Sequence, residues 1–296
     1  MELYLITGFL GAGKTTFLKN FARQFAGRRL RLIINEFGRA GVDGTLLREL
    51  DAALDEISNG SIFCACRLDQ FEAALEQAAA DAPDVVLVEA SGLADPTNVR
   101  RVLAQFPAVS YQGSVCVADA ARLEKVFSTA RACPRQLAVS SLVLLNKTDL
   151  ATEAQCAEAK ALILRANPAA RIRRTQFGRF EPEWLSLIVP DVDVDEVLDM
   201  PDITLQKAVL QIRPFAALQK CLVQLAGETW RIKGFVRVPE GIFYVDCTGP
   251  EVRLTPWQGE ADNRLVLLAG KGMQLRRTAR TAVQWYNDYI EELSMR

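Results

Sequence analysis

The clearest chemistry in this 296-residue chain belongs to the stretch that begins at Gly8, with the sequence Gly-Phe-Leu-Gly-Ala-Gly-Lys-Thr-Thr. This is the spacing of a phosphate-binding P-loop. Its glycines let backbone N–H groups turn toward an anion, its lysine can reach the β and γ phosphates, and its first threonine hydroxyl can bind Mg²⁺. We therefore predict a nucleoside triphosphate site with contacts from Gly8, Gly11, Ala12, Gly13, Lys14, Thr15 and Thr16.

A second motif, Asn146-Lys147-Thr148-Asp149, follows an apolar strand and indicates which base is bound. The Asp149 carboxylate can accept hydrogen bonds from both guanine N1–H and N2–H₂, a donor pair that adenine lacks. We expect Asn146 and Lys147 to brace the loop and to pack on the base. After a P-loop, this motif predicts GTP and GDP as the ligands.

A third motif begins at Glu89, which directly follows the apolar run 85–88, and Gly92 stands three positions after Glu89. A carboxylate at this place suits Mg²⁺, and the Gly92 N–H suits the γ phosphate, so Lys14, Glu89 and Gly92 are the predicted catalytic residues. Leu93 stands where many GTPases place a glutamine that orients water. We therefore predict intrinsic hydrolysis slower than about 1 s⁻¹.

Composition narrows the classes of protein. The formal net charge is −1, which gives no electrostatic reason to expect a nucleic-acid partner. No stretch is long and apolar enough to span a membrane, and the first strand begins too early for a signal peptide. We expect a cytoplasmic protein whose seven cysteines are mostly free thiols. Because histidine is absent, any metal site must use thiolates, carboxylates, main-chain oxygens or water.

The first 180 residues alternate strand-like and helix-like segments, which predicts a doubly wound α/β sheet with binding loops at the strand ends. The expected strands are 3–7, 30–35, 85–89, 114–119, 142–146 and 171–175. The expected helices include 15–25, 68–80, 97–105 and 153–166.

Residues 181–202, rich in proline and acidic residues, are predicted to form a linker between residues 1–180 and a smaller α+β domain over residues 203–296. In this second domain we expect strands at 204–212 and 264–268 and a helix at 214–225. A hairpin should join 230–238 to 242–247, and a long helix should cover 273–293.

Together these motifs resemble the CobW-like GTPases of the SIMIBI class of P-loop proteins. The resemblance extends to Asn35-Glu36-Phe37-Gly38 and Asp43, which look like that family's switch I, and to Trp230-Arg-Ile-Lys-Gly-Phe235, which is similar to its C-terminal signature. The family implies GTP hydrolysis linked to delivery of metals or metallocofactors, including zinc, cobalt and cobalamin pathways. It also implies that Thr15, Asp43 and Glu89 hold Mg²⁺.

The metal motif departs from the family. The family sequence Asn-Gly-Cys-x-Cys-Cys becomes Asn59-Gly-Ser-Ile-Phe-Cys64-Ala-Cys66 here. On an extended segment Cys64 and Cys66 would share one face, so they are candidate ligands for Zn²⁺, Co²⁺ or an iron–sulfur cluster. Two thiolates do not complete a tetrahedral site. Glu36 is a candidate third ligand, and a homodimer could supply four thiolates. Alternatively, both are ordinary thiols.

Three functions follow from these motifs. The first is a GTPase metallochaperone that serves a client metalloprotein or cofactor enzyme. The second is a regulatory G-protein chaperone that gates a cofactor enzyme, for example a corrinoid one, without binding metal itself. The third, a small-molecule kinase, would leave Asn146–Asp149 without a purpose.

Overall fold

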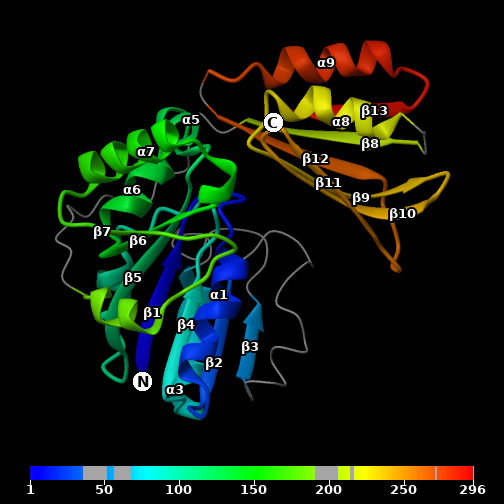
Figure 1. The fold of residues 1–296 in the computed structure, drawn as a ribbon. Coiled ribbons are helices and arrows are strands. Elements are labelled where there is room, and N and C mark those ends of the chain that lie inside the picture. Colours follow the sequence, from blue (N-terminus) through cyan, green and yellow to red (C-terminus); the bar gives the residue numbers. More distant parts are fainter. Residues whose placement is uncertain (36–51, 57–67, 191–205, 214–216, 271, 296) are drawn as a thin grey trace. The chain divides into compact units, whose positions relative to one another are not determined.

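The computed structural model describes residues 1–35, 52–56, 68–190, 206–213, 217–270 and 272–295. The chain divides into two compact units, residues 1–201 and 202–296, and each is described by itself. The first unit is built on a seven-stranded sheet with the order β3-β2-β4-β1-β5-β6-β7, in which every pair is parallel (Figure 1). Its strands are β1 Glu2–Thr7, β2 Leu30–Ile34, β3 Ala52–Glu56, β4 Val85–Glu89, β5 Ser110–Asp119, β6 Leu142–Asn146 and β7 Arg171–Arg174.

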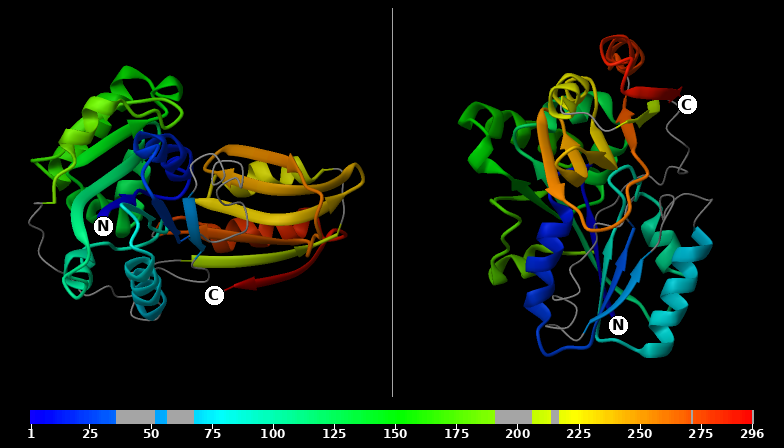
Figure 2. Two further views of the ribbon diagram at one scale, coloured as in Figure 1. Left: turned by 90° about the horizontal axis from the view of Figure 1, so that it is seen from below. Right: turned by 90° about the vertical axis from the view of Figure 1, so that its right-hand side faces the viewer.

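Helices cover both faces of this sheet, as the two views of Figure 2 show for α1 and α3. The helices are α1 Lys14–Ala22, α3 Leu68–Asp81, α4 Val99–Leu103, α5 Leu123–Thr129, α6 Ala132–Ala138 and α7 Glu153–Ala166. Alternate residues of β1 enter different cores: Tyr4 and Ile6 pack with α1, whereas Leu3 and Leu5 pack with α3. This two-sided burial explains the continuous apolar runs, and the predicted doubly wound α/β fold is confirmed.

Two strands differ from the expectation. Strand β3 was not predicted, because Ala-Ala-Leu-Asp-Glu contains no β-branched or aromatic residue. It forms the sheet edge, where the guanidinium of Arg31 on β2 pairs with Asp55 of β3 at 2.6 Å and also with Asp81 of α3. Strand β5 begins at Ser110, four residues earlier than expected, since it pairs along the whole of β1.

The segment 180–190 does not behave as a linker. Phe180 is 7% exposed and its ring lies 4.9 Å from that of Phe21 and 5.9 Å from that of Phe17. A 3₁₀ helix, Pro182–Leu187, follows, and Ile188 is also buried in the core of the first unit. The prediction that residues 181–202 link two domains is therefore wrong for residues 181–190, because Ile188 is buried in the core of the first unit and the side chains of Trp184, Leu185 and Leu187 pack against that core.

This packing predicts a measurable loss of stability on substitution. Phe180→Leu should lower the free energy of unfolding of the first unit by about 1 kcal/mol, because a smaller side chain leaves the aromatic cluster underpacked. Phe177→Leu is the matched control, since Phe177 is 63% exposed and its loss should change little. Urea unfolding of the full chain measures both, and equal effects would contradict the assignment of Phe180 to the core.

The second unit has a six-stranded antiparallel sheet in the order β11-β10-β9-β12-β8-β13. The helices α8 Leu218–Ala226 and α9 Leu275–Trp285 lie on one face of it (Figure 1). Its strands are β8 Gln206–Ile212, β9 Arg231–Val238, β10 Gly241–Thr248, β11 Glu251–Pro256, β12 Arg264–Ala269 and β13 Ile290–Met295. The predicted α+β class and the hairpin of β9 and β10 are confirmed, whereas β11 was not predicted.

The C-terminal helix is much shorter than expected. We predicted helix over 273–293, but α9 ends at Trp285 and the chain turns through Asn287 and Asp288, residue types that favour turns. Strand β13 then pairs with β8, with Ile290 opposite Ile212. Sheet pairing therefore overrides the helical pattern, and the exposed Glu291 and Glu292 suit a sheet edge.

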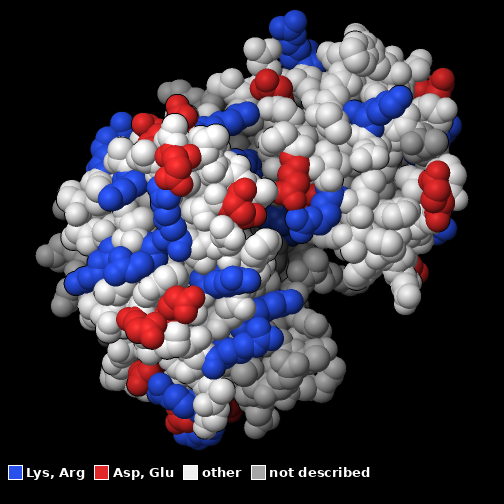
Figure 3. All heavy atoms as spheres, in the orientation of Figure 1, with Lys and Arg blue, Asp and Glu red and all other residues white. Residues whose placement is uncertain are grey.

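The surface carries charges of both signs. On the face of the first unit shown in Figure 3, basic and acidic side chains are interspersed. Across the described parts of the chain, no helix is both long enough and apolar enough to cross a membrane.

Candidate functional site

The loop between β1 and α1 adopts a conformation that its glycines make accessible. Gly8, Gly11 and Gly13 have φ angles of 133°, 73° and 103°, values that residues with a Cβ rarely adopt. A Cβ at Gly8 would collide with the carbonyl of Val117, and one at Gly13 would lie 2.6 Å from Nδ2 of Asn146. The loop thus requires glycine for its backbone angles and for the close approach of neighbouring strands.

Lys14 and Thr15 are the first two residues of α1, so they lie at the positive end of the helix dipole. Lys14 is 7% exposed, and its Nζ donates a hydrogen bond of 3.4 Å to the carbonyl of Phe9 in the loop. The Thr15 hydroxyl donates to Oε1 of Glu89 at 3.2 Å. Glu89 ends β4 and is 2% exposed. The structure therefore brings Lys14, Thr15 and Glu89 together from two neighbouring strand ends.

Asn146 joins the P-loop to the second motif. Its Nδ2 donates to the carbonyl of Ala12 at 2.9 Å, and its Oδ1 accepts from the N–H of Gly178 at 3.0 Å. Asn146 is 2% exposed, so both bonds are shielded from water. The Asn146 side chain thus links the P-loop to the turn that follows β7.

The rest of the second motif lies at the same end of the sheet. Lys147 has a φ of 59°, and its ammonium pairs with Asp119 at 3.0 Å. Asp149 is exposed in the 3₁₀ turn Thr148–Leu150. The Thr148 hydroxyl donates to the carbonyl of Thr175 at 3.1 Å. Sequence reasoning missed Asp119, although its place at the end of an apolar strand was an available signal.

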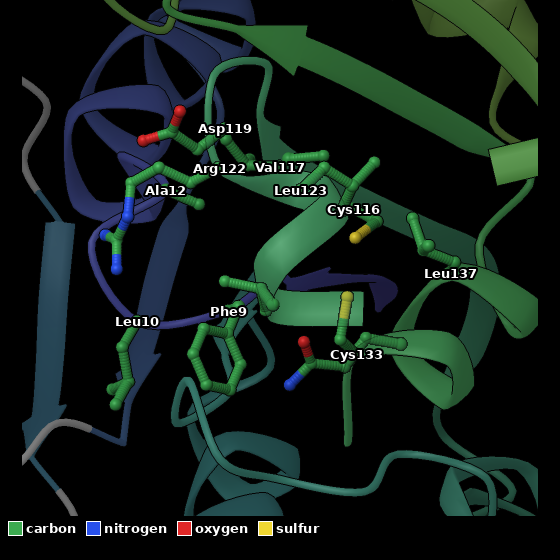
Figure 4. A pocket seen from close by; sticks show the side chains of 13 residues that line it. Phe9, Leu10, Ala12, Cys116, Val117, Asp119, Arg122, Leu123, Cys133 and Leu137 are labelled. Atoms are coloured by element: carbon green, nitrogen blue, oxygen red, sulfur yellow. The ribbon is translucent and has the colours of Figure 1, made fainter. Parts of the chain in front are cut away.

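A small pocket lies behind the P-loop, between the ends of β5, α5 and α6 (Figure 4). The sulfur atoms of Cys116 and Cys133 both point into it. Burial raises the pKa of the Cys116 thiol to about 12 and raises that of Cys133 as well. Burial thus disfavours the thiolate forms of both cysteines, and the thiolate is the form that binds metal.

The other described cysteines do not form a metal site either. Burial raises the pKa values of the Cys221 and Cys247 thiols to about 12. Within the described ranges, no group of three or more His, Cys, Asp or Glu side chains could hold a metal ion. The predicted ligands Glu36, Asp43, Cys64 and Cys66 lie outside the described residues.

The parallel sheet, the glycine-rich loop and α1 define a P-loop nucleotide-binding protein. Residues 2–174 match the family described as CobW/HypB/UreG, nucleotide-binding domain. The chain therefore belongs to the CobW/HypB/UreG family, and the resemblance stated from the sequence is confirmed.

Several known proteins are similar to this chain. A zinc chaperone CobW of Pseudomonas aeruginosa is 32% identical over 206 residues, covering 57% of this chain and 55% of the relative. The zinc chaperone YjiA of Escherichia coli is 29% identical over 161 residues, covering 51% and 50%. The chain spans about half the length of the curated relatives it matches. A crystal structure of Zn(II)-bound YjiA GTPase from E. coli aligns over 96% of this chain and 98% of that chain, with 18% identity and a TM-score of 0.48.

Proposed function

We propose that this protein binds GTP and hydrolyses it to GDP and phosphate. The observation that carries the proposal is the pair of hydrogen bonds made by Asn146, which hold the P-loop and the turn after β7 together at one end of the sheet. These bonds support the proposal because Asn146, the first residue of the proposed guanine motif, contacts Ala12 of the P-loop across 134 positions of the chain. In this proposal Gly8–Thr16 cradle the phosphates, and Asn146, Lys147 and Asp149 recognise guanine.

The same site suits Mg²⁺. The Thr15 hydroxyl and the Glu89 carboxylate are neighbouring oxygen donors, the ligand type that this ion prefers. We assign both to the ion, with Asp43 as a further ligand. When bound, Mg²⁺ would neutralise charge on the β and γ phosphates. The protein's own contribution is to place Lys14 and the Gly92 N–H at the γ phosphate, with Leu93 unable to orient water, so that hydrolysis is slow.

For the cargo, we propose a transition metal, with zinc first, bound by Cys64, Cys66 and Glu36. Two observations support this. The curated relatives are named zinc chaperones, and within the described residues no group of three or more His, Cys, Asp or Glu side chains could hold a metal ion. The role would be a cytoplasmic metallochaperone whose second unit presents a surface to a client metalloprotein.

Equilibrium dialysis of the full chain, prepared without oxygen, tests both halves of the proposal. We expect GTP and GDP to bind at least a hundredfold more tightly than ATP. We also expect about one Zn²⁺ per chain, or one per two chains for a shared four-thiolate site, in the presence of a non-hydrolysable GTP analogue. The double variant Cys64→Ser/Cys66→Ser should lose Zn²⁺ and keep GTP, while Cys221→Ser/Cys247→Ser should keep both.

The second function, a regulatory G-protein chaperone without metal, is favoured by the loss of two motif cysteines and by the absence of histidine. It predicts tight GTP binding with no Zn²⁺, Co²⁺ or iron–sulfur cluster bound by the unsubstituted chain. The same dialysis therefore separates the two functions.

A further inference from the structure

The segment that follows β4 is held by two consecutive residues of α6. Gln136 is 1% exposed, and its Nε2 donates to the carbonyl of Gly92 at 3.2 Å and to that of Ala94 at 2.9 Å. Arg135 forms an ion pair with Asp95, which is 5% exposed. Three of the four residues from Gly92 to Asp95 are therefore fixed by side chains of one helix.

On its other side, this segment touches the P-loop. A Cβ at Gly92 would lie 2.7 Å from the backbone nitrogen of Leu10 and 2.9 Å from its Cα. Gly92 is therefore in direct contact with the loop that would cradle the phosphates. The segment 92–95 therefore contacts the P-loop on one side, and its carbonyl groups at Gly92 and Ala94 accept hydrogen bonds from Gln136.

Gln136 also contacts the strand that leads into the loop. Its main-chain carbonyl accepts hydrogen bonds from the hydroxyls of Thr7, at 3.4 Å, and Ser140, at 2.8 Å. Thr7 is the last residue of β1 and immediately precedes Gly8. A single buried residue thus touches the base of the P-loop through its backbone and the segment 92–95 through its side chain.

Burial of the Gln136 carboxamide costs folding free energy, which the hydrogen bonds donated by its Nε2 must offset. No described residue donates a hydrogen bond to its buried Oε1, and an unsatisfied buried oxygen destabilises a folded protein. An apolar side chain of the same length would avoid this cost in a pocket lined by Phe9, Leu123 and Leu137. We therefore take the two donor bonds to Gly92 and Ala94 to be the reason for a glutamine here.

We propose that Gln136 is a positioning residue for the γ phosphate of GTP. It holds Gly92–Asp95 against the P-loop in advance, so that the Gly92 N–H is in place when the triphosphate binds. Arg135 supports the same segment through Asp95. This inference rests on the proposed GTP hydrolysis, and it concerns only the γ phosphate, since GDP has no group that reaches this segment.

The test is Gln136→Met, which keeps the length of the side chain and removes both donors. Binding of GDP should change less than twofold. Affinity for a non-hydrolysable GTP analogue should fall about tenfold, and kcat should fall by a similar factor, because two buried carbonyls lose their partner and the segment loosens. Gln105→Met, at an exposed position, is the control and should change neither value.

A second variant and a nucleotide-free measurement complete the test. Arg135→Gln should lower the ratio of the affinity for the GTP analogue to the affinity for GDP about threefold. The effect should be smaller than that of Gln136→Met because the ion pair of Arg135 with Asp95 is partly exposed to solvent. In protein without nucleotide, amide hydrogen exchange of Leu93 and Ala94 should be faster in Gln136→Met than in the unsubstituted chain. Equal losses of GDP and analogue binding, or unchanged exchange, would overturn the proposal. If the unsubstituted chain fails to bind GTP, the proposed function fails, while the exchange measurement still decides whether Gln136 holds the segment.

Discussion

Replacing Lys14 by methionine should lower kcat/KM for GTP hydrolysis by about 10²–10³-fold. The Nζ of Lys14 lies inside the P-loop, 3.4 Å from the Phe9 carbonyl, where it can stabilise the negative charge that develops on the transferred phosphoryl group. Methionine retains the apolar stem and removes the charge, so the loss should fall on catalysis rather than on folding. Phosphate release measured at several GTP concentrations gives both kinetic constants.

Lys19→Met is the matched control for this effect. Lys19 lies in the same helix and is half-buried, but it is not part of the loop. Its substitution should leave kcat/KM within about twofold. If the two lysine variants lost activity equally, the assignment of Lys14 to the phosphates would be wrong.

Replacing Asp149 by asparagine should change which base is bound. The Asp149 carboxylate accepts two guanine N–H groups in the proposed site, so its loss should weaken GTP binding by about 10²–10³-fold. Xanthine carries a carbonyl where guanine has its amino group, and the asparagine amide can donate to that oxygen. The variant should therefore bind xanthosine triphosphate more tightly than GTP, which competition against a fluorescent nucleotide measures.

The structure supplies the reason to expect a change of specificity without unfolding. Asp149 is exposed in its 3₁₀ turn, and the turn is held instead by Thr148 and by the pair of Lys147 with Asp119. Asp288→Asn, at an exposed position of the second unit, is a control that should leave the preference for GTP unchanged. GTP binding that survived Asp149→Asn at full strength would exclude the proposed guanine contact.

The fold was predictable to the extent that local pattern and burial agree. Strands such as Val85–Glu89 and Leu142–Asn146 are continuous apolar runs because the sheet buries both of their faces. Strand β3 and the end of α9 were not predictable in this way. Strand β3 is extended because it pairs with β2, and the residues after α9 are extended because β13 pairs with β8. Such pairing between distant segments decides the conformation where the local sequence pattern is weak.

The linker prediction failed for a similar reason. Proline and a nearby acidic run indicated an extended connection, but Ile188 is buried in the core of the first unit, and Trp184 and Leu187 pack against that core. Composition averages over a segment, whereas burial is decided by the individual side chains that can reach a core. The ring of Trp184, inside the predicted linker, lies 5.8 Å from that of the buried Phe180.

The sequence by itself determined the chemistry of the phosphate site, because a P-loop is formed by consecutive residues whose glycines and lysine act through local geometry. It also determined membership of the CobW/HypB/UreG family, since the matching motifs are contiguous. Only the tertiary structure decided how these motifs cooperate. Asn146 reaches Ala12 across 134 positions, and Gln136 reaches Gly92 across 44. Such contacts depend on how the sheet orders its strands, which spacing along the chain does not contain.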